Sequence, residues 1–143
     1  METKNLLFID LFYPGTLEQQ CLFNELTIKY SNVFKVEKEE LLLYCLQAKI
    51  PDIIILNPVL PPTFLFDSKI KFVTLDLPKG IVGFELFKKI IKLTELAGKK
   101  PKIILYTVTP FKNLVEVGFP ENMESFYIQK PAFTADVIEK IEE

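Results

Sequence analysis

The stretch that decides the fold is Pro51-Asp52-Ile53-Ile54-Ile55-Leu56-Asn57-Pro58-Val59-Leu60-Pro61-Pro62. Its four consecutive apolar residues, three of them β-branched, predict a strand buried on both faces, which is typical of a parallel sheet. The prolines that follow cannot donate to a ladder, so the chain must leave the sheet at Asn57. Because chemistry in open α/β sheets gathers just beyond the carboxyl ends of the strands, Asn57 is the first candidate functional position.

Strands and helices alternate on both sides of this segment. Apolar runs predict four further strands, and amphipathic patterns with polar starts predict the helices between them. The expected strands are residues 5–9, 32–36, 102–106 and 125–129, and the expected helices are residues 17–30, 37–49, 83–97, 111–117 and 134–143. Thr16 and Thr134 are the expected caps of the first and last helices. This alternation predicts a five-stranded parallel sheet covered on both faces.

One segment does not fit the alternation. Residues 63–82 lie where a strand-to-helix connection should be short. Within this insertion, residues 69–76 alternate partly like an additional strand, which we expect at a sheet edge or folded over the strand ends. The chain is otherwise expected to be one domain, residues 1–143, without an output domain.

Composition limits the classes of function. Hydrophobic residues make up 49% of the 143, which indicates a packed core, and the net charge of −2 argues against a nucleic-acid surface. There is no histidine, which removes the commonest general base and metal ligand. Cys21 and Cys45 are expected to be small buried side chains in a reducing compartment. Neither a signal pattern nor an apolar run of membrane-spanning length occurs, so we expect a cytoplasmic protein without membrane contact.

Five motifs occur in order along the chain. They are Ile9-Asp10, Leu56-Asn57-Pro58-Val59-Leu60-Pro61, Gly83-Phe84-Glu85-Leu86, Tyr106-Thr107 and Tyr127-Ile128-Gln129-Lys130-Pro131. Together they resemble the receiver domain of two-component response regulators, a flavodoxin-like three-layer α/β/α fold with five parallel strands. The similarity extends over nearly the whole chain apart from residues 63–82.

The resemblance implies a role for each of these positions. In that family an aspartate after the third strand accepts a phosphoryl group, and acids after the first strand help to hold Mg²⁺. A Thr or Ser and a Lys before proline contact the phosphoryl oxygens, and an aromatic on the last strand reports the switch. The matching positions here are Asn57 (acceptor), Asp10 (metal), Thr107 and Lys130 with Pro131 (phosphoryl contacts), and Tyr127 (switch).

Two substitutions remove the chemistry that the resemblance implies. An acyl phosphate requires a carboxylate nucleophile, and the amide of Asn57 cannot replace it. Leu11 follows Asp10 where a second acid would be expected, so one carboxylate remains where Mg²⁺ needs several anionic oxygens. Deamidation of Asn57 is disfavoured because Pro58 has no backbone N–H for the cyclisation. We therefore expect no catalytic residue, no Mg²⁺ and no enzymatic activity.

The other positions of this degenerate site have structural alternatives. We expect Lys130 to pair with Asp10 across the strand ends rather than to bind phosphate. Thr107 can hydrogen-bond either a loop backbone or a ligand. Tyr127 is more typical of a core or interface position than of a switch.

Asp76 is an alternative acceptor. The run Thr74-Leu75-Asp76-Leu77-Pro78 also resembles the third strand of a receiver, although its spacing to Gly83 is one residue short and its proline comes early. Residues 51–57 directly follow the second expected helix, as the family has it. They are therefore the favoured third strand, which leaves residues 69–76 as the extra one.

The sequence favours a pseudo-receiver that acts through contact with an unidentified signalling protein. Apolar side chains in residues 111–143 favour a symmetric homodimer through that region; they are Phe111, Leu114, Phe119, Phe126 and Phe133. The insertion at 63–82 is a second candidate contact surface. The alternative function is a working phosphoacceptor, or a small-ligand-binding α/β protein, that uses Asp10, Asp76 and Lys130.

Overall fold

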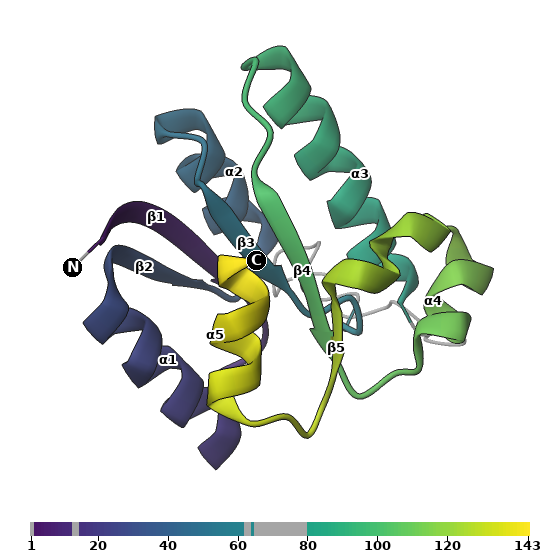
Figure 1. The fold of residues 1–143 in the computed structure, drawn as a ribbon. Coiled ribbons are helices and arrows are strands. Elements are labelled where there is room, and N and C mark those ends of the chain that lie inside the picture. The colour runs from purple at the N-terminus through teal and green to yellow at the C-terminus, as the bar shows by residue number, and fades with distance from the viewer. Residues whose placement is uncertain (1, 13–14, 62–63, 65–79) are drawn as a thin grey trace.

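The computed structural model describes residues 2–12, 15–61, 64 and 80–143 (Figure 1). Five parallel strands form one sheet in the order β2-β1-β3-β4-β5. The strands are β1 (Glu2–Ile9), β2 (Tyr30–Val36), β3 (Ile53–Leu56), β4 (Lys102–Thr107) and β5 (Tyr127–Gln129). The helices are α1 (Leu17–Lys29), α2 (Glu39–Ala48), α3 (Ile81–Leu96), α4 (Phe111–Val117) and α5 (Thr134–Glu142), with the 3-10 helix η2 (Glu121–Phe126) before β5. The predicted flavodoxin-like α/β/α fold is confirmed.

The sheet separates two apolar layers. Successive side chains of a strand point to opposite faces, so β1 supplies both layers. Leu7 and Ile9 pack with residues of α2 and α3, whereas Leu6 and Phe8 pack with residues of α1 and α5. Figure 1 shows the same division, with α2 and α3 on one side of the sheet and α1 and α5 on the other. The central strand β3 is buried along its whole length, as its apolar run predicts.

Register brings the carboxyl ends of the strands to one edge. Ile9 pairs with Leu56 and Leu56 with Leu105. Thr107 pairs with Gln129. Asp10, Asn57 and Lys130 each follow one of these strand ends, so the register places them together.

A close approach fixes the start of α3 beside this edge. The N–H of Gly83 donates to the carbonyl of Pro58 at 3.2 Å, and a Cβ on Gly83 would lie 2.2 Å from the Pro58 Cα. Only glycine fits so short a distance. The first turn of α3 therefore rests directly on the turn that carries Asn57.

Several element boundaries differ from the sequence prediction: β1 begins at Glu2 instead of 5, β2 at Tyr30 instead of 32 and α2 at Glu39 instead of 37. β5 begins at Tyr127 instead of 125, because η2 extends through Phe126. α3 begins at Ile81 instead of 83, with Gly80 as its N-cap in the left-handed region at φ 95°. Thr134 is the first residue of α5 instead of its cap, and Phe133 occupies the cap position. In contrast, Thr16 caps α1 as predicted.

Two expectations about burial are wrong. Cys21 is exposed because Leu22 and Leu26 provide the core face of α1, and Cys45 is half-buried because Leu42 and Leu46 provide the core face of α2. Leu114 and Phe119 are buried in the layer formed with α3, so they do not belong to the surface expected for a homodimer. The strand predicted at residues 69–76, which includes Asp76, lies outside the described residues. None of the helices that the structure describes combines the length and apolar character needed to cross a bilayer.

Candidate functional site

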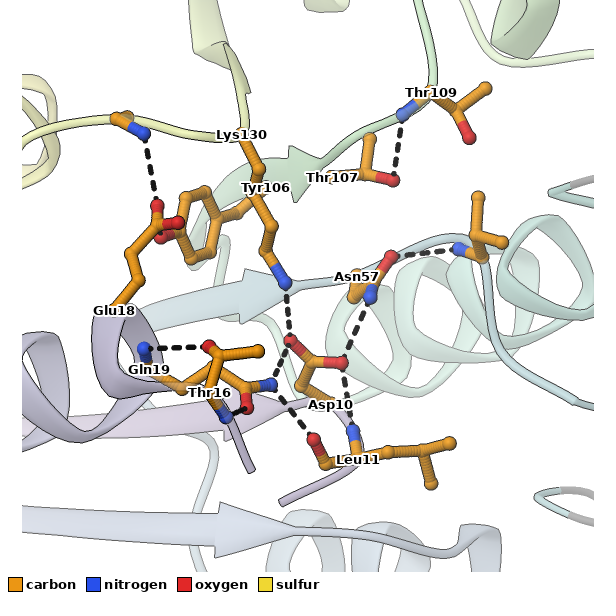
Figure 2. A network of polar contacts seen from close by, with 12 residues as sticks. Asp10, Leu11, Thr16, Glu18, Gln19, Asn57, Tyr106, Thr107, Thr109 and Lys130 are labelled. Atoms are coloured by element: carbon orange, nitrogen blue, oxygen red, sulfur yellow. Dashed lines mark hydrogen bonds and ion pairs between the residues drawn. The ribbon is translucent and has the colours of Figure 1, made fainter. Parts of the chain in front are cut away.

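Asp10 is the centre of a polar network at the carboxyl edge of the sheet (Figure 2). Its side chain is buried, and both oxygens accept two hydrogen bonds each. Oδ1 accepts from the Leu11 backbone N–H at 2.7 Å and from Asn57 Nδ2 at 2.8 Å. Oδ2 accepts from Gln19 Nε2 at 2.9 Å and from Lys130 Nζ at 2.8 Å. Four N–H donors therefore fill the acceptor positions of one carboxylate.

The amide of Asn57 is oriented from both ends. Its Oδ1 accepts the backbone N–H of Val59 at 2.9 Å, which is an Asx turn across Pro58. That bond directs Nδ2 towards Asp10. A carboxylate in the same place would bring two anionic oxygens to about the same separation, so the amide matches Asp10 in a way that an acid does not.

Lys130 neutralises the buried carboxylate. The Lys130 and Asp10 side chains are 14% and 3% exposed, and their ion pair is the one the sequence predicts. The Lys130 ammonium also lies 4.7 Å from the centroid of the Tyr106 ring, a cation–π contact. The backbone N–H of Lys130 donates to the Thr107 carbonyl at 2.8 Å. Ring, carboxylate and backbone together fix the position of this cation, and a cis peptide bond leads from it to Pro131.

The start of α1 supplies the fourth donor. Thr16 and Gln19 form a capping box in which each side chain accepts the backbone N–H of the other, at 3.1 and 2.9 Å. The Gln19 amide nitrogen then donates to Asp10 and to the Leu11 carbonyl. The sequence analysis did not identify Gln19 as a site residue. The spacing of Gln19 three residues after Thr16 was the signal that could have found it.

A second bridge joins β4, α1 and the β5–α5 connection. Glu18 Oε1 accepts the Tyr106 hydroxyl and the backbone N–H of Ala132, the latter at 2.9 Å. Burial, and then the hydrogen bond to Glu18, raises the pKa of Tyr106 far above its usual range, so its hydroxyl remains a donor at neutral pH. Neither Glu18 nor Tyr106 was predicted to have this role.

Thr107 and Tyr127 bond the loop after β4. The Thr107 hydroxyl accepts the Thr109 backbone N–H at 3.2 Å, which is the loop-backbone alternative for this residue. The Tyr127 hydroxyl donates to the Thr109 carbonyl, and its ring packs on Phe111 with centroids 5.3 Å apart. Burial raises the pKa of Tyr127. Both side chains therefore stabilise the β4–α4 connection.

The side chains at this edge do not fit Mg²⁺. The ion requires oxygens with free lone pairs, whereas both oxygens of Asp10 already accept two donors, one of them an ammonium. Asn57 presents its nitrogen to this centre because its oxygen is bonded to Val59. Across the described ranges, no cluster of three or more His, Cys, Asp or Glu side chains is placed to hold a metal.

The structure thus brings three predicted site residues, Asp10, Asn57 and Lys130, into direct contact. Thr107 and Tyr127 lie on the adjacent strands β4 and β5 and bond the loop. Asp76, the alternative acceptor, lies outside the described residues.

Solved structures share this fold. A Chloroflexus aurantiacus protein provisionally named a response regulator is 15% identical with a TM-score of 0.55, and the match covers 99% of this chain and 96% of that chain. A structure in which a trimeric coiled coil of yeast Spc42 is fused to another structure is also 15% identical, with a TM-score of 0.59 and coverage of 99% and 76%. No protein-family model and no curated protein matches the sequence. At this identity the likeness shows the receiver-like fold alone.

Proposed function

We propose that this protein is a receiver-like signalling module that acts by protein contact, without phosphorylation, Mg²⁺ or catalysis. The observation that carries the proposal is the Asp10 carboxylate, whose oxygens accept four N–H donors. Asn57 lies at the position where a working receiver has its acceptor, and an amide cannot form an acyl phosphate. The site that performs phosphotransfer in a receiver therefore serves here to join β1, β3, β5 and α1.

The ion pair supports the same proposal. A lysine that binds a phosphoryl oxygen needs its ammonium available to an incoming anion. Lys130 already has an anionic partner in Asp10, and the contact is largely buried. An added phosphate would have to compete with that pair and would leave the Asp10 carboxylate buried without its cation, which is unfavourable.

A protein-contact function requires a partner, which the proposal takes to be a cytoplasmic signalling protein. We also propose a homodimer through residues 111–143. Its apolar contact surface is smaller than the sequence indicates, because Leu114 and Phe119 are buried. Phe133 does contribute to that surface, since the residue is 80% exposed. Light scattering at tens of micromolar tests this self-association, and a monomer at that concentration would count against it.

The experiment for the main proposal is a titration with beryllofluoride and Mg²⁺, followed by backbone amide NMR of the whole chain. Beryllofluoride mimics an aspartyl phosphate and needs an acceptor carboxylate and a metal site together. We expect no saturable shift at Asp10, Asn57 or Thr107. A saturable, Mg²⁺-dependent shift at these residues would contradict the proposal.

The same titration, repeated on a variant, tests whether Asp76 is the phosphoryl acceptor. If a response does appear, repeating it with Asp76→Asn assigns it. Loss of the response in that variant would identify a working receiver that uses Asp76. Persistence of the response would point to Asp10 and would show that the carboxyl edge does hold Mg²⁺.

A further inference from the structure

The outer face of α1 carries apolar residues that the fold leaves uncovered. Leu17, Cys21 and Ile28 are exposed, as is the polar Asn24 between them, and the four follow one another at intervals of four, three and four residues. This spacing places them in one line along the helix. Leu17 is 76% exposed and Ile28 68% exposed. A helix that uses Leu22 and Leu26 for the core would ordinarily be polar on its other side.

A groove runs beside this line, between α1 and α5. The two helices lie next to each other on one face of the sheet (Figure 1), and the side chains of Lys29 and Glu142 pair across them. The groove has a volume of about 830 Å³. Its lining residues are Cys21, Asn24 and Glu25 from the α1 side and Thr134, Ala135, Ile138, Glu139, Glu142 and Glu143 from the α5 side. Its apolar lining residues are Cys21, Ala135 and Ile138, and Cys21 also belongs to the exposed line on α1.

The charged residues that line the groove are all glutamates, and no lysine lines it. Glu142 and Glu143 pair with Lys29 and Lys140 at the rim. Within the described part of the chain, Glu25 and Glu139 take part in no ion pair. The groove therefore presents a net negative potential beside a few apolar side chains and the exposed apolar residues of α1, which complements a partner with cations beside an apolar stripe.

We propose that the α1–α5 groove binds an amphipathic helix of a partner protein, whose apolar stripe is flanked by Lys or Arg. The 4-3-4 spacing on α1 is the spacing with which one helix receives the side chains of another. The inference rests on the proposed function, since it names the chemistry of the partner that a contact module requires. It also adds a surface that the sequence analysis did not identify.

A second copy of this chain is the weaker occupant. A symmetric contact would place the groove against itself, and Glu25 and Glu139 would then face carboxylates of the same groove. Juxtaposed like charges oppose such an interface. The charge of the groove therefore favours a basic partner over self-association.

The test uses two peptides of identical composition, rich in Leu and Lys and about eighteen residues long, so that a helix would span the groove. In one, Leu recurs at 4-3-4 spacing with Lys beside it. In the other, the same residues are scrambled so that Leu is distributed around the helix. Each is titrated into the whole protein and followed by amide NMR. We expect shifts confined to α1 and α5 and an affinity at least about tenfold higher for the striped peptide.

Variants assign the binding to the groove. Leu17→Ser and Glu139→Lys should each weaken the striped peptide about tenfold. Leu96→Ser is the matched control, because Leu96 is 77% exposed, does not line the groove and belongs to α3, on the opposite face of the sheet from α1 and α5 (Figure 1). It should bind like the unaltered protein.

Three results would overturn the inference. The first is equal affinity for the striped and the scrambled peptide, and the second is an equal loss of affinity for the striped peptide in Leu96→Ser. The third is a set of concentration-dependent shifts on α1 without peptide, which would identify a second copy as the occupant. If the striped peptide does not bind the groove but beryllofluoride has no effect, the further inference is wrong and the proposed function is unaffected. A beryllofluoride response would refute that function whatever the peptide does.

Discussion

Two aspartate–lysine pairs bond at opposite ends of the sheet, and their geometry is nearly the same. Asp10 and Lys130 are 2.8 Å apart at the carboxyl edge, and Asp52 and Lys99 are 2.9 Å apart just before β3. Each aspartate also accepts a backbone N–H, from Leu11 in one case and Asn5 in the other. The pairs differ in exposure: the side chains of Asp52 and Lys99 are 33% and 40% exposed, whereas Asp10 and Lys130 are largely buried.

This difference teaches that burial, and not distance, decides what an ion pair does in this fold. At the exposed end, water competes for both charges, so either partner can be removed at little cost. At the buried end, each charge depends on the other and on the neutral amides around it. The carboxyl edge therefore behaves as one unit, and the predictions below separate the two ends.

Lys130→Met should have the largest effect. It leaves the Asp10 carboxylate buried without a cation, and we expect a loss of about 3 kcal/mol in the free energy of unfolding. Urea denaturation measures it. The matched control is Lys99→Met, which should cost less than about 1 kcal/mol. Equal losses in the two variants would remove the distinction between the ends.

Asn57→Asp should cause the second-largest loss in the free energy of unfolding. The substitution changes no volume, but it sets a second carboxylate against Asp10, and we expect a loss of about 2 kcal/mol at neutral pH. Two facing carboxylates raise the pKa of one of them. The destabilisation should therefore shrink as the pH falls through that raised pKa and one group takes up a proton. Added Mg²⁺ should also restore part of the stability of the variant and none of the unaltered protein. A variant as stable as the parent would contradict the match between amide and carboxylate.

Thr16→Ala should cost about 1 kcal/mol, because it removes the hydroxyl that accepts the Gln19 backbone N–H at the start of α1, next to the side-chain amide that donates to Asp10. The control is Thr27→Ala, since the Thr27 hydroxyl bonds only the Asn24 carbonyl at the surface of the same helix. Chemical denaturation of both variants gives the comparison. Similar small losses would show that the capping box does not support the network.

Asp52→Asn should have the smallest effect and a distinct pH dependence. The Asn5 backbone N–H, and then Lys99, lowers the pKa of Asp52. The group therefore adds stability above its unfolded pKa of about 4 and loses it as the pH falls through the lower folded value. We expect a loss of about 0.5 kcal/mol at pH 7. The difference from the parent should vanish below the folded pKa, and a difference that persists there would be inconsistent with this origin.

The order of elements could be predicted because it follows from local sequence, and the Asp10–Lys130 pair because the resemblance to receiver domains places both residues at strand ends. Buried runs such as residues 53–56 define strands, and parallel strands bring their ends to one edge. Gln19 and Glu18 were missed because their bonds depend on how α1 is rotated over the sheet. A polar residue in a first helical turn is compatible with solvent as well as with a buried carboxylate.

The same limit explains the error at Cys21. Apolar residues lie on more than one side of α1, so periodicity alone does not identify the side that faces the core. Leu22 and Leu26 are buried, and Cys21 with Ile28 is exposed. The groove between α1 and α5 therefore could not be predicted from the sequence, because it depends on how the two helices lie beside each other.

Asp10 has two primary amides among its donors, and this gives the protein a spectroscopic reporter of its own. One hydrogen on Asn57 Nδ2 and one on Gln19 Nε2 point at a buried carboxylate. We expect these side-chain protons to exchange slowly with water and to resonate apart from those of solvated amides. A single ¹⁵N spectrum can thus follow the integrity of the carboxyl edge during binding, heating or titration, without altering a residue.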